Sequence, residues 1–151
     1  MPKRETHVMI GALAGSSFAA YRGREQQLPN MLLETIGGGF GGYIGSRLPD
    51  VIEPASWPGH REFAHSATAG GGIAYSLYRL LEIWEEYFRS QAKYYNDRKS
   101  EEDICWFHQL FYAILEVLSC IAAGSLGGLG TGYVSHLALD GRTPKGLPLL
   151  Q

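Results

Sequence analysis

The stretch Gly124-Ser125-Leu126-Gly127-Gly128-Leu129-Gly130-Thr131-Gly132 decides the fold, together with the mostly apolar residues 104–123 that precede it. Gly124, Gly128 and Gly132 are four residues apart, and positions with this spacing share one face of a helix. The same spacing recurs in the pairs Gly11 and Gly15, Gly38 and Gly42, and Gly41 and Gly45. A face without side chains lets another backbone approach closely. The glycine spacing therefore predicts tightly packed helices, either in a membrane bundle held by contacts between small residues or in a soluble bundle whose helices converge on a buried site.

Composition narrows the class of protein further. The 151 residues are typical of a single domain, which we place at residues 1–151. Thirteen basic and fifteen acidic side chains give a net charge of −2, which excludes a strongly basic nucleic-acid-binding module. We therefore expect no direct binding to nucleic acid. Glycine contributes 20 residues, well above its usual share of about 7%.

Apolar periodicity predicts helices over residues 6–20, 31–47, 62–95 and 100–123, and a last helix that follows the glycine-rich stretch and ends near residue 140. Residues 49–59 contain several prolines and are predicted to form a loop. Alternation of apolar and polar residues, the signature of strands, is not sustained anywhere. The prediction is an all-α, compact, glycine-rich bundle of about five helices.

The cysteines and the hydropathy bear on location. Cys105 and Cys120 fall in one predicted helix about 22 Å apart, too far for a disulfide, which is typical of a reducing compartment. Residues 104–123 are long enough to cross a bilayer. However, Glu116 lies near their middle, at an insertion cost of about 2.5–3.5 kcal/mol, and the mean hydropathy of the chain is −0.11. These features favour a soluble, cytoplasmic bundle and leave peripheral contact with a membrane open.

Three histidines and one aspartate have sequence spacings that suit the binding of a metal ion. His136 and Asp140 are four apart and project from one face of the last predicted helix. His60 and His65 follow the proline-rich loop. Imidazole and carboxylate ligands without cysteine favour Zn²⁺, Mn²⁺ or Fe²⁺ in a hydrolytic site. The alternative for His136 and Asp140 is a surface hydrogen bond.

The proline-rich loop itself carries two more carboxylates, Asp50 and Glu53. Together with the histidines they could hold one divalent ion, or two ions a few ångströms apart. Next to proline, both are also ordinary turn residues, and the spacing alone does not show that the groups meet in space.

Three segments together resemble a known family. They are Leu48-Pro49-Asp50-Val51-Ile52-Glu53-Pro54 with Pro58-Gly59-His60-Arg61-Glu62-Phe63-Ala64-His65-Ser66, then Gly132-Tyr133-Val134-Ser135-His136-Leu137-Ala138-Leu139-Asp140 with Thr143-Pro144-Lys145-Gly146, and Thr6-His7 before a helix of small residues. The chain resembles the metal-dependent hydrolases that include the inner-membrane-associated, LexA-binding group.

The resemblance implies an α-helical hydrolase, distantly similar to zinc-dependent phospholipase C, with one or two divalent ions at the convergence of its helices. Zinc is the expected metal, with manganese or iron as alternatives. The metal ligands that it implies are His7, Asp50, Glu53, His60, His65, His136 and Asp140. Many relatives have clear transmembrane helices, which are not expected in this chain, so the expected location stays cytoplasmic, with association with the inner membrane as the alternative.

The resulting hypothesis is hydrolysis of a small anionic or phosphoester substrate by a water that the metal activates. Asp50 or Glu53 would act as general base, and Arg61 would hold an anionic oxygen of the substrate. Two hypotheses of other classes stay open. One is a binding or regulatory protein with a structural metal, and the other is a membrane-peripheral interaction protein. A homo-oligomer is compatible with all three.

Overall fold

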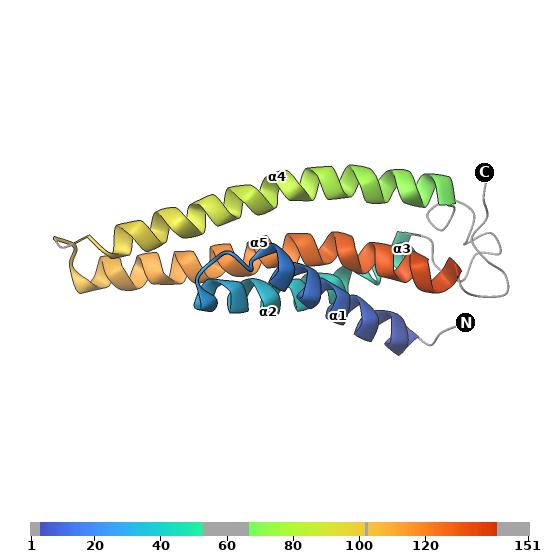
Figure 1. The fold of residues 1–151 in the computed structure, drawn as a ribbon, viewed down its shortest axis with the longest axis horizontal. Helices are drawn as coiled ribbons and strands as arrows, with labels where there is room; N and C mark the ends of the chain where they lie inside the picture. The colour runs from blue at the N-terminus through green and yellow to red at the C-terminus, as the bar shows by residue number, and fades with distance from the viewer. Residues whose placement is uncertain (1–3, 53–66, 102, 142–151) are drawn as a thin grey trace.

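Figure 1 shows the computed structural model of the chain, in which residues 4–52, 67–101 and 103–141 are described. Those residues form helices and no strand, which confirms the predicted all-α class. The helices are α1 (Arg4–Arg22), α2 (Leu28–Gly45), α3 (Leu48–Ile52), α4 (Ala67–Lys99) and α5 (Trp106–Gly141).

The two longest helices, α4 and α5, run antiparallel along the whole molecule (Figure 1). Helices α1 and α2 form a shorter antiparallel pair that packs along the C-terminal part of α5. As a result, the first turn of α1, the short helix α3 and the last turn of α5 lie at the same end of the bundle (Figure 1). We call this the α3 end.

Two expectations about element boundaries were wrong. The predicted break at the glycine-rich stretch is absent, because α5 continues through it from Trp106 to Gly141. Glycine disfavours a helix interior by about 1 kcal/mol relative to alanine, but here the backbone of α2 packs on the glycine face and keeps the helix intact. The predicted loop 49–59 begins with the helix α3, whose Pro49 lies in the first turn, where a missing N–H does no harm.

Close backbone approach is confirmed at the glycines that the sequence singled out. A Cβ atom at Gly128 would collide with the carbonyl oxygen of Gly38, and a Cβ at Gly42 would collide with that of Gly11. Gly42 therefore contacts α1 and Gly128 contacts α2 directly through the backbone. These contacts set the separation of α1, α2 and α5.

We expect Gly128→Leu and Gly42→Leu each to destabilise the protein by about 1–3 kcal/mol or more, because a side chain at either position forces two helices apart. Unfolding midpoints in detergent measure the effect. Gly72→Leu is the matched control, since a Cβ there meets no atom within 4 Å. Equal midpoints in all the variants would contradict the close-packing account.

Helix α4 is joined to the other helices by buried ion pairs. Glu34 of α2 is fully buried and accepts hydrogen bonds from Arg89 of α4, at 2.6 Å from Nη2 and 3.0 Å from Nε. Arg89 also pairs with buried Glu85, to which Arg22 of α1 donates at 3.1 Å. The alternating charges thus connect three helices, and each buried carboxylate has a cationic partner.

A second such pair lies further along α4. Lys99, in its last turn, is paired with the buried side chain of Glu116 on α5. The acid that argued against a membrane-spanning helix is therefore neutralised inside the bundle. This pairing lowers the cost of placing α5 in an apolar environment.

Candidate metal centre

The candidate centre lies at the α3 end of the bundle, where α1 and α3 contribute one side chain each and α5 contributes two. His7 comes from the first turn of α1, Asp50 from α3, and His136 and Asp140 from the last turns of α5. His7, His136 and Asp140 are buried, with exposed fractions of 6%, 1% and 4%. Asp50 is exposed. The cluster therefore has a buried floor and one carboxylate on its open side.

The carboxylate of Asp140 lies between the two imidazoles. Its Oδ1 is 3.5 Å from Nε2 of His7, and its Oδ2 is 3.5 Å from Nε2 of His136. The two rings have centroids 4.2 Å apart at an interplanar angle of 30°. Because His136 and Asp140 are one helical turn apart, the rigid helix fixes their relative position, and α1 brings His7 to the same point.

Asp50 places a second carboxylate near Nε2 of His136. Its Oδ1 is 3.5 Å from Nε2 of His136. The position follows from the short helix α3, which begins two residues after buried Ser46 and packs against α5. Four potential ligands from three separate segments thus converge.

The other nitrogen of His136 is held by the backbone. Nδ1 lies 2.5 Å from the carbonyl oxygen of Ser46, and only a protonated nitrogen can donate to a carbonyl. In the neutral imidazole the lone pair then resides on Nε2, which faces the carboxylates of Asp50 and Asp140. A positive charge between these atoms, supplied by a proton or by a metal ion, would relieve the repulsion between the lone pair and the carboxylates. Metal-binding histidines commonly have this second hydrogen bond.

The spacing of the donor atoms fits a divalent ion. Zinc binds histidine nitrogen and carboxylate oxygen at about 2.0–2.2 Å in tetrahedral geometry, so its ligand atoms lie about 3.4 Å apart. The three His–Asp separations of 3.5 Å are close to this value, and those from Asp140 use its Oδ1 toward His7 and its Oδ2 toward His136. One ligand atom from each of His7, His136 and Asp140 lies within 4.8 Å of the other two. The residues present therefore suit zinc, manganese or iron.

The structure brings together four of the residues proposed from the sequence: His7, Asp50, His136 and Asp140. The remaining candidates, Glu53, His60, Arg61 and His65, lie outside the described residues. Their segment, residues 53–66, follows directly after α3, which carries Asp50. The contribution of these four stays a prediction.

Sequence reasoning missed the carbonyl of Ser46, which orients His136. A main-chain acceptor has no signature in the order of side chains, so no pattern could have revealed it. The ion pair of Glu34 with Arg89 could have been expected from the sequence, because an acid within an otherwise apolar helix requires a buried partner.

The outer surface of the bundle is unusually apolar. On α2 a row of large side chains at every fourth position is exposed: Leu28, Leu32, Ile36, Phe40 and Ile44. Similar rows occur on α1 and α5, with Met9, Leu13, Leu110, Ile114 and Leu118. Soluble monomers rarely expose continuous apolar surface of this kind. By length and composition, α5 could cross a membrane.

Fold and site together define a helical, glycine-packed protein with a histidine–aspartate cluster at one end and an apolar outer surface. Residues 1–151, the entire chain, match the family model of the YdjM inner membrane protein. The chain therefore belongs to the YdjM inner membrane protein family. Searches of curated proteins and of solved structures give no significant match.

Membership of this family supports an association with the inner membrane, which the sequence had left open. The predicted cytoplasmic location is not confirmed. The preference for a soluble bundle rested on Glu116 and on the mean hydropathy of the chain. Both measures treat charges as unpaired, whereas Glu116 pairs with Lys99 and Glu34 pairs with Arg89 inside the bundle.

We expect the protein to remain in the membrane pellet after washes with high salt and with alkaline carbonate. Its exposed rows of leucine, isoleucine and phenylalanine need a hydrocarbon environment, and salt or high pH does not weaken that contact. Immunoblotting of pellet and supernatant is the measurement. Quantitative release by carbonate would instead indicate peripheral attachment.

Proposed function

We propose that the protein is a metal-dependent hydrolase of the inner membrane, with its catalytic centre at the α3 end of the bundle. The observation that carries this proposal is the convergence of His7, Asp50, His136 and Asp140 from three segments of the chain. A structural histidine–aspartate contact needs two such residues and not four. Membership of an inner membrane protein family supports the location.

Each residue has a distinct role in this proposal. His7 and His136 supply neutral nitrogen ligands, and Asp140 bridges between them with its two oxygens. A carboxylate in this position could hold one ion or join two. If these residues held a divalent ion, the ion would supply a water of lowered pKa and a Lewis acid for an oxygen of the substrate. Asp50 is the exposed member of the cluster, so it can accept a proton from water at the open side.

The substrate class that we propose is a small anionic phosphoester. Two features support it: the resemblance to phospholipase-type hydrolases, and Arg61, which the sequence places between the candidate ligands His60 and His65. A guanidinium can bind two phosphate oxygens at once. An amide or acyl ester would use the same water and the same ion, so the substrate panel must include both.

The function is tested with the purified protein in detergent against phosphomonoesters, phosphodiesters, nucleotides and phospholipids, followed by peptides and acyl esters. We expect phosphoester cleavage that a chelator abolishes and that Zn²⁺ or Mn²⁺ restores. We expect Arg61→Ala to lower turnover by about 10²-fold, as when a donor to the transition state is removed, and to leave the metal content unchanged.

The outcomes separate the hypotheses. Cleavage of only the amide or acyl panel by the metal-loaded protein would overturn the phosphoester assignment but retain a metallohydrolase. Loss of metal from Arg61→Ala would show a structural role for this arginine. No cleavage of any substrate by the metal-loaded protein would contradict the enzyme and favour a regulatory protein with a structural metal.

A further inference from the structure

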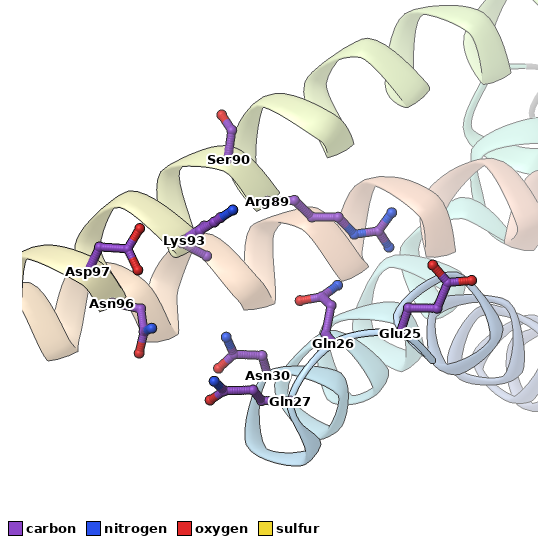
Figure 2. Close-up of a pocket in the computed structure, with 10 residues that line it drawn as sticks. Glu25, Gln26, Gln27, Asn30, Arg89, Ser90, Lys93, Asn96 and Asp97 are labelled. Carbon is purple, nitrogen blue, oxygen red and sulfur yellow. The ribbon is translucent and has the colours of Figure 1, made fainter.

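A second polar site lies at the other end of α1 and α2. It is a cavity of about 530 Å³ between the segment that connects these two helices and the facing side of α4. Figure 2 shows the two walls of the cavity, with Gln27 and Asn30 on one wall and Lys93 and Asn96 on the other. Neither the hydrolase proposal nor the family assignment accounts for it.

The position of the cavity places it far from the candidate metal centre. Helices α1 and α2 have 19 and 18 residues, so they are about 28.5 and 27 Å long. This length is close to the hydrocarbon thickness of a bilayer, about 30 Å. The exposed apolar row on α2 extends over the whole helix, from Leu28 to Ile44. If α1 and α2 traverse the hydrocarbon layer, the cavity lies among the headgroups of the leaflet opposite the metal centre.

The lining of the cavity is rich in carboxamides, each of which can donate and accept hydrogen bonds. These are Gln26, Gln27, Asn30 and Asn96. They come from both walls, so a ligand between them can be bound on two sides. Gln26 is also tied to the ion pairs below the cavity, because its Nε2 donates to Glu34 at 2.6 Å.

The charges of the lining have both signs. Lys93 and Asp97 are one turn apart on α4 and both are exposed, and both belong to the lining. Arg89 lines the cavity as well, but its charge is offset by two buried acids, Glu34 and Glu85. The wall of α4 therefore offers one ammonium and one carboxylate to a ligand, and Glu25 adds a second carboxylate from the opposite wall. A purely anionic ligand would meet the carboxylate of Asp97.

We propose that this cavity binds a zwitterionic group composed of a phosphate and a primary ammonium, as in the phosphoethanolamine headgroup of a lipid or in free phosphoethanolamine. Lys93 contacts the phosphate, Asp97 contacts the ammonium, and the carboxamides donate to the phosphate and accept from the ammonium. A quaternary ammonium is excluded by the same chemistry, because it has no N–H to donate to Asp97 or to the carboxamide oxygens.

The test is native mass spectrometry of the full chain in detergent with three lipids that have identical acyl chains: phosphatidylethanolamine, phosphatidylcholine and phosphatidylglycerol. We expect retention of phosphatidylethanolamine about tenfold above the other two, the size of effect that one hydrogen bond to a charged group gives. Competition with soluble phosphoethanolamine distinguishes the sources. Displacement at comparable concentration means that the headgroup alone is recognised, and persistence of the bound lipid means that its acyl chains contribute as well.

Matched variants on α4 locate the binding. Lys93→Gln should reduce retention about tenfold, because the phosphate loses its cationic partner. Arg79→Gln is the control, since Arg79 lies on the same helix, pairs with Glu82 at 3.3 Å and does not line the cavity. Equal retention of the three lipids, no retention of any, or full retention by Lys93→Gln would each overturn the proposal.

Discussion

Purified His136→Ala should retain little of the divalent metal that the wild-type protein carries, with a loss of affinity of at least about 10–100-fold. His136 is the central ligand of the candidate centre, since its Nε2 lies 3.5 Å from both Asp50 and Asp140. Removing it takes away one of the four donors and also the ring that Ser46 orients. Inductively coupled plasma mass spectrometry of protein purified without chelator measures the effect.

Two further variants make this result specific. Asp140→Asn keeps the volume of the side chain and removes its charge, so it should also lose metal while the helix remains. His108→Ala should keep the wild-type metal content, because His108 is exposed at the opposite end of α5, where its Nδ1 lies 3.0 Å from Cys105. Equal metal content in all three variants would remove His136 and Asp140 from the centre.

Arg89→Met should destabilise the protein by about 3–5 kcal/mol, because it leaves the fully buried carboxylate of Glu34 without its cationic partner. Gln26 still donates to Glu34, but a neutral amide does not balance a buried charge. The double variant Arg89→Met with Glu34→Leu should recover much of the loss, since an apolar pair of similar size avoids the buried charge. Thermal unfolding in detergent, followed by circular dichroism, measures all of these.

Arg79→Met is the matched control on the same helix. Its ion pair with Glu82 at 3.3 Å is exposed, and such pairs contribute about 0–1 kcal/mol. If Arg89→Met unfolds at the same temperature as Arg79→Met, the ion pairs among α1, α2 and α4 do not stabilise the bundle.

The sequence predicted the helical class and the close packing because both depend on spacing within short segments. Gly128 and Gly42 lie at the predicted helix contacts. The predicted break in α5 failed for a physical reason: helix propensity is local, whereas the contact of Gly124 with the backbone of Glu34 is tertiary.

The candidate site was partly predictable for the same reason. His136 and Asp140 share a helical face, so their proximity follows from their spacing. The approach of His7 and Asp50 depends on how α1 and α3 pack against the end of α5, and spacing within a segment carries no information about that. For His7 the resemblance to a hydrolase family supplied the expectation, whereas Asp50 was a candidate because it is a carboxylate in the loop before His60 and His65.

The mean hydropathy of the chain did not capture how its charges are paired. It counts Glu34, Glu116 and Arg89 as equally costly wherever they lie. In the structure each of them is paired with an opposite charge inside the bundle, and the exposed surfaces of α1 and α2 carry rows of apolar side chains. Pairing depends on which helices are neighbours, so a residue average along the chain cannot express it.

The most direct test of the account is X-ray absorption spectroscopy at the metal edge of the purified protein. We predict a first shell of nitrogen and oxygen atoms at about 2.0–2.2 Å, with the outer-shell scattering of imidazole rings. In His136→Ala that imidazole scattering should fall together with the metal content. A protein without metal after purification in the absence of chelator, or a shell dominated by sulfur at about 2.3 Å, would contradict a centre built from His7, Asp50, His136 and Asp140.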